Sequence, residues 1–367
     1  MERKEFFMKY VYELPAEMMQ ETEKRGEVRR LDYDTNTYDG DAGRPLHKGA
    51  WVYLPHGYSA GQKYNVLYLL HGGGVNEDWW FKMFPDTVVM LDNMMERKIC
   101  QPCIIAAPTY YRGDETDRDA EYVTEHFCYE LRRDLIPAVE SEFSTYTDGD
   151  VSEQNLIQTR RHRAFAGLSL GSMTTYRAAL YNNFDLFSWY GPFSGCCGPN
   201  GNRDREVERI QKTLAEAESR GLALDYLFCC NGDKDVAYAE HWDIMERTVP
   251  VCPQLVPGKN YDFFTIPGGV HDMKAWQLHL YHATENCGKC RGKRSFSFVT
   301  AACRFMVCFN YLPICRFIYQ HFIILNAKSN TIKLINRQIC CYSSDPLSNR
   351  QFPLAPVFNF LCLNRIF

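Results

Sequence analysis

The sequence predicts an α/β fold in which helices cover both faces of a mostly parallel central sheet. From residue 50 onward, short apolar runs alternate with longer stretches of helical periodicity. The apolar runs are nearly continuous, which is typical of strands that are buried on both faces. Strand and helix alternating at this spacing indicate βαβ units, and these units build parallel sheets.

The composition agrees with a globular protein. Of the 367 residues, 46 % are hydrophobic and 23 % are charged, which excludes a wholly disordered or collagen-like chain. The net charge of −4 excludes a strongly basic nucleic-acid binder, so no nucleic-acid partner is expected.

The predicted strands are, in order, residues 50–54, 65–70, 103–107, 162–168, 224–230 and 261–266. The predicted helices are residues 88–97, 122–143, 172–181, 203–220, 238–247 and 272–284. Ligands of parallel sheets bind at the carboxyl ends of the strands. The residues that directly follow each strand are therefore the first candidates for function.

A change of composition near residue 290 divides the chain. Residues 291–367 contain ten Lys or Arg and one acidic residue, whereas the part before them contains thirty-one basic and forty-four acidic residues. The apolar residues of this tail have no sustained period, and polar residues interrupt its best membrane window. We expect a working domain in residues 1–288, with residues 1–47 as an N-terminal extension. Residues 289–367 form a Cys- and Phe-rich basic tail that is not expected to be an independent domain.

The first residues and the cysteines bear on the cellular compartment. Residues 1–13 contain no apolar run of signal-peptide length, so the chain as given is expected to be cytoplasmic, or secreted if its signal is missing from this chain. No membrane span is expected. The adjacent pairs Cys196-Cys197 and Cys229-Cys230 cannot readily form disulfides within each pair, so reduced, buried thiols are expected.

The turn after the predicted strand 162–168 contains a candidate nucleophile. The sequence Gly-Leu-Ser-Leu-Gly spans residues 167–171 and leads into a helical pattern. A nucleophile elbow needs this order of strand, sharp turn and helix, with small residues beside the serine so that the turn can close. Ser169 is therefore the predicted nucleophile; the alternative is a serine in an ordinary Gly-rich turn.

A second Gly-rich turn, His71-Gly72-Gly73-Gly74, follows the strand 65–70. Glycine allows the backbone to approach a ligand closely and to turn its N–H groups inward. We assign the oxyanion hole to the backbone N–H groups of Gly73 and Leu170. A phosphate-binding loop is disfavoured because no Lys-Ser/Thr pair follows.

An acid and a histidine follow the two last predicted strands, in the order that this architecture requires of a triad. Asp235 lies after the strand 224–230, and His271 lies after the strand 261–266. His271 would accept the proton of Ser169, and the carboxylate would orient the imidazole. Asp233 remains the alternative acid.

The motifs together resemble the esterase D / feruloyl esterase group, the first family of carbohydrate esterases within the α/β-hydrolase superfamily. The resemblance covers about residues 48–285 and rests on Leu-Leu-His-Gly-Gly-Gly (69–74) with Trp79, Gly-Leu-Ser-Leu-Gly (167–171), Gly-Asp-Lys-Asp (232–235), and Gly-Gly-Val-His-Asp (268–272) with Trp276. It implies an α/β-hydrolase fold and a serine esterase whose triad is Ser169, Asp235 and His271. Members of the group act on feruloyl or acetyl esters of xylan, on S-formylglutathione, on siderophore esters, or as acyltransferases.

Large aromatic residues flank these motifs and are candidates for contact with a small-molecule or polysaccharide-linked ester. We assign substrate binding to Trp79 and Trp276, because an aromatic face can stack on a phenolic or sugar ring. Trp80, Tyr110 and Tyr111 are weaker candidates beside the same loops. The alternative for all five is packing beneath the loops.

The resulting hypothesis is a serine carboxylic-ester hydrolase that cleaves feruloyl or acetyl esters of plant cell-wall polysaccharide. The alternatives are an S-formylglutathione or siderophore-ester hydrolase and a catalytically silent binding protein with a hydrolase fold. Triad chemistry needs no cofactor and no metal. A four-thiolate zinc site from Cys100, Cys103, Cys287 and Cys290 is disfavoured, because the first pair leads into a predicted strand. The sequence does not indicate the oligomeric state.

Overall fold

The computed structural model describes residues 10–39, 43–113, 120–195 and 202–286 of the chain. The chain divides into two units, Met1–Ser295 and Phe296–Phe367, and every described residue belongs to the first. The predicted boundary at residue 288 and the predicted tail 289–367 lie outside the described residues.

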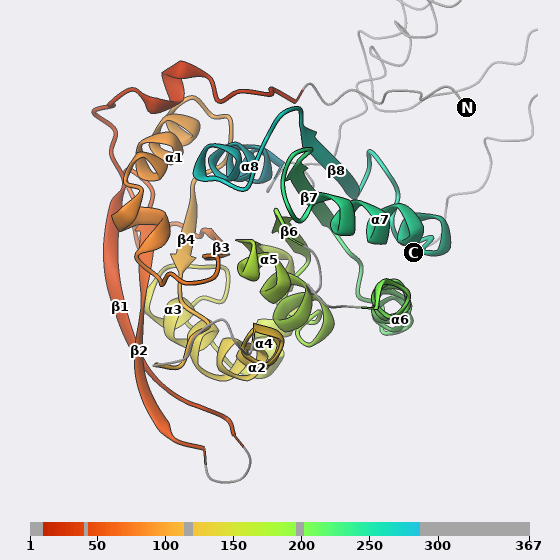
Figure 1. The fold of residues 1–367 in the computed structure, drawn as a ribbon. Helices are drawn as coiled ribbons and strands as arrows, with labels where there is room; N and C mark the ends of the chain where they lie inside the picture. The colour runs from red at the N-terminus through yellow and green to blue at the C-terminus, as the bar shows by residue number, and fades with distance from the viewer. Residues whose placement is uncertain (1–9, 40–42, 114–119, 196–201, 287–367) are drawn as a thin grey trace, which may run out of the picture. The chain divides into compact units, whose positions relative to one another are not determined.

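Eight strands form one sheet in the order β1-β2-β4-β3-β5-β6-β7-β8. β1 pairs antiparallel with β2, β2 pairs antiparallel with β4, and all other pairs are parallel. The mostly parallel sheet of the predicted α/β fold is therefore confirmed (Figure 1). The strands are β1 (Glu27–Asn36), β2 (Pro45–Leu54), β3 (Asn65–Leu70), β4 (Cys103–Ala107), β5 (Arg163–Leu168), β6 (Trp189–Phe193), β7 (Tyr226–Gly232) and β8 (Tyr261–Ile266).

All six predicted strands are present, and two strands were not predicted. β1 lies within the predicted extension 1–47; its side chains are mostly exposed or half-buried and many are charged, so it lacks the apolar run of a buried strand. β6 is fully buried, but its sequence Trp-Tyr-Gly-Pro-Phe contains the two residues that most often interrupt strands. Pairing with β5 and β7 on its two sides overrides that local preference.

Helices cover both faces of the sheet, as predicted, and each face has its own hydrophobic cluster. α1 and α8 pack against each other over one face (Figure 1). The remaining helices cover the other face. The bounds are α1 (Asp86–Glu96), α2 (Ala120–Glu130), α3 (Ile136–Glu142), α4 (Glu153–Gln158), α5 (Leu170–Thr174), α6 (Arg203–Ser219), α7 (Tyr238–Thr248) and α8 (Met273–Asn286).

Short irregular helices complete these elements. A π-helical turn, Leu131–Leu135, joins α2 to α3, and another, Thr175–Tyr181, continues α5. A third π-helical turn, Trp79–Met83, follows the Gly-rich loop after β3. None of the helices in the described part of the chain combines the length and the apolar character needed to cross a membrane.

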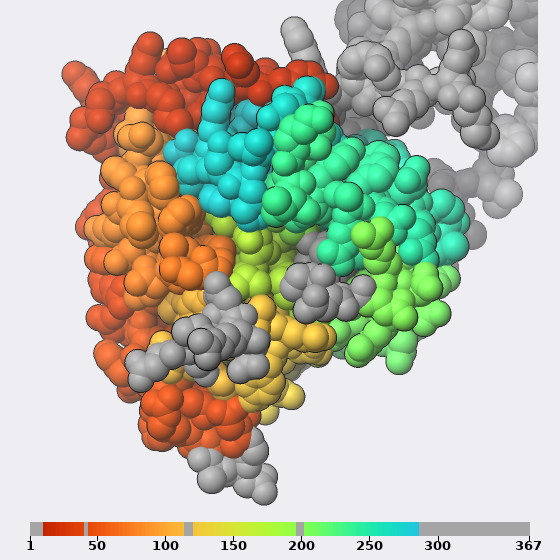
Figure 2. Space-filling model, viewed as in Figure 1, coloured from red at the N-terminus to blue at the C-terminus, as the bar shows by residue number. Residues whose placement is uncertain are grey.

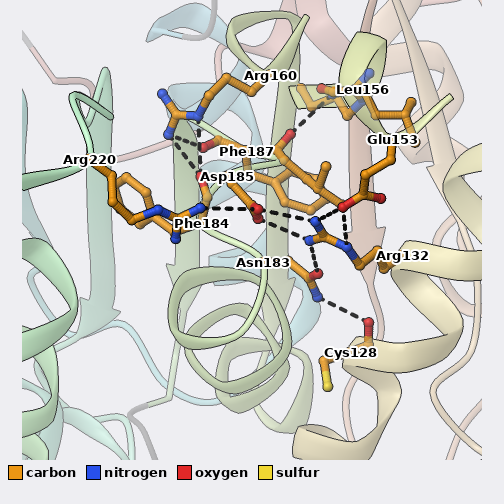
Figure 3. A network of polar contacts seen from close by, with 12 residues as sticks. Cys128, Arg132, Glu153, Leu156, Arg160, Asn183, Phe184, Asp185, Phe187 and Arg220 are labelled. Atoms are coloured by element: carbon orange, nitrogen blue, oxygen red, sulfur yellow. Dashed lines mark hydrogen bonds and ion pairs between the residues drawn. The ribbon is translucent and has the colours of Figure 1, made fainter. Parts of the chain in front are cut away.

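Polar side chains join the segments that lead into β5 and β6, at the ends of these strands far from Ser169. The guanidinium of Arg160 is buried and donates to the carbonyl oxygens of Phe184 and Phe187 (Figure 3). Beside it, Arg132 forms hydrogen bonds of 3.0 Å with Asn183 and Asp185 (Figure 3). These contacts join the segments that precede the two strands.

Most of the described cysteines agree with the expectation of buried thiols, although Cys103 is half-buried and the predicted pair Cys196-Cys197 lies outside the described residues. Cys128, Cys229, Cys230 and Cys252 are free and buried. Burial raises the pKa of the Cys229 thiol to about 12 and that of Cys128 to about 11, so both stay protonated and unreactive at neutral pH. Cys287 and Cys290, two ligands of the disfavoured zinc site, lie outside the described residues. Among the described residues, no group of three His, Cys, Asp or Glu side chains is arranged to hold a metal ion.

A buried ion pair joins α3 to β5. The guanidinium of Arg163 lies 2.5 Å from Glu140 Oε1, and the two side chains are only 1 % and 2 % exposed. Glu140 also accepts hydrogen bonds from Tyr68 and Thr145. Every oxygen of this carboxylate has a partner, which compensates for removing it from water.

The first prediction concerns this pair. Arg163→Leu should lower the free energy of unfolding by about 3–5 kcal/mol, because it leaves the Glu140 charge buried without a counterion. Urea denaturation followed by circular dichroism measures the change. Lys63→Leu is the control, since its pair with Asp148 is exposed and should contribute at most about 1 kcal/mol. Similar losses in the two variants would contradict the prediction.

Candidate active site

Ser169 occupies a sharp turn between β5 and α5. Its backbone has φ 53° and ψ −114°, a conformation that costs free energy for any residue with a Cβ. The turn is held because the Ser169 N–H donates to Phe193 O on β6 at 2.9 Å, while the Ser169 carbonyl accepts from Ser172 and Met173 in the first turn of the helix. The strand, the turn and the helix of a nucleophile elbow are therefore all present.

Two glycines make this turn possible. A Cβ on Gly167 would lie 2.5 Å from the carbonyl oxygen of Gly171, and a Cβ on Gly171 would lie 2.5 Å from that of His71. Real Cβ atoms do not approach backbone that closely, so any larger residue would push α5 away from β3 and β5. The spacing Gly-x-Ser-x-Gly in the sequence follows from these two contacts.

The three predicted triad residues come together at the carboxyl ends of β5, β7 and β8. His271 Nε2 lies 3.1 Å from Ser169 Oγ, and His271 Nδ1 lies 2.9 Å from Asp235 Oδ1. The Asp235 side chain is fully buried, and the His271 side chain is 28 % exposed. The hydroxyl, the imidazole and the carboxylate thus form one continuous chain of hydrogen bonds.

The environment keeps Asp235 ionised. Burial raises the pKa of its carboxyl, but hydrogen bonds from His271 and from the Ala237 N–H outweigh this effect, so its pKa lies below the ordinary value. The alternative acid, Asp233, points elsewhere: its Oδ1 accepts from the Gly268 N–H at 2.8 Å. Asp233 therefore connects the two loops, and Asp235 contacts the histidine.

The loops that carry Asp235 and His271 touch through their backbones. A Cβ on Gly232 would lie 2.1 Å from the carbonyl oxygen of Gly269, and the Lys234 N–H donates to that same oxygen at 2.9 Å. Because neither glycine has a side chain, the two loops can approach closely enough for the side chains of Asp235 and His271 to meet.

On the face drawn in Figure 2, the orange segment after β3, the yellow-green segment around α5 and cyan α8 lie against one another.

The Gly-rich loop after β3 lies directly against Ser169. A Cβ on Gly72 would lie 3.4 Å from the Cβ of Ser169. The Gly72 carbonyl accepts from Tyr110 at 2.6 Å and from His71 Nδ1 at 2.7 Å. Across a trans peptide the next N–H points the opposite way, so the Gly73 N–H points away from Tyr110. No acceptor in the described part of the chain takes it.

Leu170, the other predicted oxyanion donor, is the first residue of α5. The first N–H groups of a helix have no partner within the helix and lie at the positive end of its dipole. The Leu170 N–H is one of these groups, and it belongs to the residue that directly follows Ser169.

Tyr110 and Tyr111, which the sequence offered only as weaker candidates for contact with substrate, support the Gly-rich loop instead. Tyr110 is buried rather than lining a cleft, and its hydroxyl holds the Gly72 peptide. Tyr111 is also buried, and its hydroxyl accepts from the Gly74 N–H at 3.1 Å. Both residues follow β4, which pairs with β3 in the sheet. Their place directly after a predicted strand was the only feature of the sequence that pointed to a contact with this loop.

The tryptophans separate into two groups. Trp276 packs edge-on against His271 with 5.0 Å between ring centroids, and the half-buried Trp79 packs edge-on against Trp276 at 6.1 Å. Trp276, which is buried, therefore lies beside the histidine, and Trp79 lies beside Trp276; substrate binding by the two stays a prediction. Trp80 is buried and donates to Leu70 O, so it belongs to the core.

Comparison with known proteins identifies relatives of this chain. The model of the Esterase family matches residues 47–286. Endo-1,4-beta-xylanase Y of Acetivibrio thermocellus is 34 % identical over 255 residues, which cover 67 % of this chain and 22 % of that protein. An endo-1,4-beta-xylanase/feruloyl esterase of Xylanibacter ruminicola is 31 % identical over 150 residues, which cover 39 % of this chain and 19 % of that protein. The chain thus spans about a fifth of the length of these relatives.

Solved structures show the same architecture. A mutant of the feruloyl esterase module from Clostridium thermocellum, complexed with sinapinate, superposes with a TM-score of 0.64 at 27 % identity, covering 76 % of this chain and 96 % of that chain. A ferulic acid esterase from Anaeromyces mucronatus superposes with a TM-score of 0.55 at 19 % identity, covering 76 % of this chain and 97 % of that chain, and shares the fold.

The second prediction concerns the support of the Gly-rich loop. Tyr110→Phe removes the O–H that holds the Gly72 carbonyl and should lower kcat for p-nitrophenyl acetate about 3- to 10-fold, because one hydrogen bond is lost and the His71 bond remains. KM should change little. Tyr190→Phe is the matched control, since that buried hydroxyl donates to Phe187 O, outside the site. Unchanged kcat in Tyr110→Phe would contradict the role of this contact.

Proposed function

The chain belongs to the Esterase family, and on that premise we propose that it is a serine carboxylic-ester hydrolase with Ser169, His271 and Asp235 as its catalytic triad. The observation that carries the proposal is the hydrogen-bonded chain from Ser169 Oγ through His271 to Asp235, at 3.1 and 2.9 Å. These distances are within the range required between a nucleophile and its general base.

Acylation is the first half of the reaction. Ser169 Oγ attacks the ester carbonyl carbon while its proton passes to His271 Nε2, and the Asp235 carboxylate stabilises the imidazolium that forms. The tetrahedral intermediate then collapses: the bond to the alcohol oxygen breaks, and His271 returns the proton to that oxygen. The products are a free alcohol and an acyl group bound to Ser169.

Deacylation repeats these steps with water as the nucleophile. His271 accepts a proton from the water as the water oxygen attacks the acyl carbon, and it then gives the proton back to Ser169 Oγ. The carboxylic acid leaves, and the enzyme returns to its starting state. Every proton is exchanged at His271 Nε2, which explains why Nδ1 must stay bonded to Asp235 throughout.

The oxyanion of each tetrahedral intermediate requires hydrogen-bond donors. We assign these to the N–H groups of Gly73 and Leu170. Gly73 is supported by the orientation of its peptide, fixed by Tyr110 and His71, and Leu170 by its place at the start of α5. Each such donor typically contributes about 10²–10³ in rate.

The proposed substrates are feruloyl or acetyl esters on plant cell-wall polysaccharide. The buried Trp276 packs against His271, and the half-buried Trp79 packs against Trp276, so the partly exposed Trp79 ring is the one that can contact an aromatic acyl group. The names of the two curated relatives, a xylanase and a xylanase/feruloyl esterase, also support this substrate class. So does the feruloyl esterase module that superposes on this chain.

The third prediction tests the nucleophile. Ser169→Ala should lower kcat for p-nitrophenyl acetate by about 10⁶-fold, because the covalent route is lost, while the circular dichroism spectrum stays unchanged. Ser141→Ala is the control, since that serine lies exposed on α3. Wild-type turnover by Ser169→Ala would eliminate the triad assignment and favour a silent binding protein or a different site.

The fourth prediction tests the substrate class. The purified chain should hydrolyse methyl ferulate with a higher kcat/KM than S-formylglutathione. The Trp79→Ala variant should have a KM for methyl ferulate that is about 2- to 10-fold higher, which is the expected effect of losing one ring contact. KM for p-nitrophenyl acetate should not change. Trp242→Ala, at a half-buried tryptophan on α7, is the control. Preference for the thioester, or equal KM changes for both esters, would contradict the aromatic-ester assignment.

A further inference from the structure

Ser194 lies at the carboxyl end of β6, between the nucleophile and the acid. It directly follows Phe193, whose carbonyl accepts the Ser169 N–H, and its own N–H donates to Cys230 O on β7 at 2.8 Å. The next residue, Gly195, accepts from Ser172 Oγ at 3.0 Å. The Ser194 side chain is completely buried. Its position is therefore fixed from both neighbouring strands.

The backbone of Ser194 adopts a conformation that favours glycine. Its φ is 48°, and it is one of five non-glycine residues with positive φ in the described part of the chain; Ser169 is another. A residue with a Cβ pays roughly 1 kcal/mol or more for this conformation. Strained residues of this kind cluster at functional sites, so the presence of a serine where a glycine would fit better indicates a use for the hydroxyl.

Two buried polar atoms at this edge of the sheet have no hydrogen-bond partner of normal geometry within the described residues. Asp235 Oδ1 is fully used, because it accepts from both His271 and the Ala237 N–H. The two atoms are Asp235 Oδ2 and Ser194 Oγ, for which the described part of the chain supplies no partner. A buried carboxylate oxygen without a donor is costly. The nearby Ser194 hydroxyl nevertheless affects Asp235: burial raises the pKa of this carboxyl, whereas the hydrogen bonds from His271 and the Ala237 N–H and the proximity of the Ser194 hydroxyl lower it.

The other titratable groups near Asp235 do not donate to Oδ2, and the thiol among them, Cys230, donates to the carbonyl oxygen of Pro192. They are His241 on α7, His279 on α8 and Cys230 on β7. Burial lowers the pKa of His241 and of His279 to about 3, so both are neutral at pH 7. His241 is bonded to Tyr176 and Asn231, and neither nitrogen of His279 makes a hydrogen bond within the described residues.

We propose that the Ser194 hydroxyl donates a hydrogen bond to Asp235 Oδ2 in the working enzyme and is a positioning residue of the triad. The inference rests on the proposed function. With Oδ2 held by Ser194, the carboxylate keeps Oδ1 directed at His271 Nδ1. Part of the carboxylate charge is then shared with the hydroxyl, which moderates how strongly Asp235 stabilises the imidazolium.

Replacing Ser194 by Ala and by Gly tests the proposal. Both Ser194→Ala and Ser194→Gly remove the hydroxyl, but only glycine also relieves the positive φ. Both should lower kcat for p-nitrophenyl acetate about 10-fold, the effect of one hydrogen bond to a charged group, with KM changed less than 2-fold. The acidic limb of the kcat/KM–pH profile should move to higher pH in both, because the unshared carboxylate charge stabilises the imidazolium more strongly.

Two controls complete the experiment. Ser188→Ala removes a second buried serine hydroxyl that has no partner among the described residues, at the opposite end of β6, and should leave kcat and the pH profile unchanged. Ser169→Ala, measured alongside, tests the triad itself. Should Ser169→Ala retain activity, the proposed function fails. If Ser169→Ala is inactive but Ser194→Gly keeps wild-type kcat and the wild-type acidic limb, only the role of Ser194 is overturned. Should Ser194→Ala not fold, Ser194→Gly decides the outcome.

Discussion

The strained turn at Ser169 is the constraint on which the rest of the site depends. Its positive φ is costly for a residue with a Cβ, and hydrogen bonds to β6 and to the first turn of α5 hold the turn in place. Gly167 and Gly171 allow α5 to pack against the ends of β3 and β5, and the Phe193 carbonyl holds the Ser169 N–H. At the opposite ends of β5 and β6, Arg160 joins the segments that lead into the two strands through hydrogen bonds to Phe184 and Phe187 (Figure 3).

The rest of the site follows from the same edge of the sheet. Parallel strands end together, so loops after β3, β5, β7 and β8 meet although they are separated by many residues in the sequence. Close backbone contact at Gly232 and Gly269 brings the acid to the histidine. A buried carboxylate without hydrogen-bond donors lowers the stability of the fold. Each donor that compensates for the burial of the Asp235 carboxylate also fixes the direction of that group. Stability and catalytic geometry therefore depend on the same hydrogen bonds.

Much of this could be predicted from the sequence, and the exceptions have physical causes. The buried strands and the order of Ser169, Asp235 and His271 are local patterns, so residue types alone reveal them. β6 was missed because its Gly-Pro pair favours a turn, and only pairing on both sides makes it a strand. Sequence left Asp233 open as the acid, because both carboxylates occupy one loop and only the loop geometry separates them. Tyr110 acts through a hydrogen bond 38 residues away in the chain, which no local pattern encodes.

Covalent labelling tests the central claim most directly. An organophosphate ester such as diethyl p-nitrophenyl phosphate reacts with a serine only when a neighbouring base activates it and an oxyanion hole receives the charge. The account predicts that the full-length protein takes up one equivalent of the phosphoryl group, that peptide mass spectrometry locates it on Ser169, and that hydrolytic activity is lost in proportion. Full inhibition with the label on another residue, or continued turnover by protein fully labelled at Ser169, would contradict it.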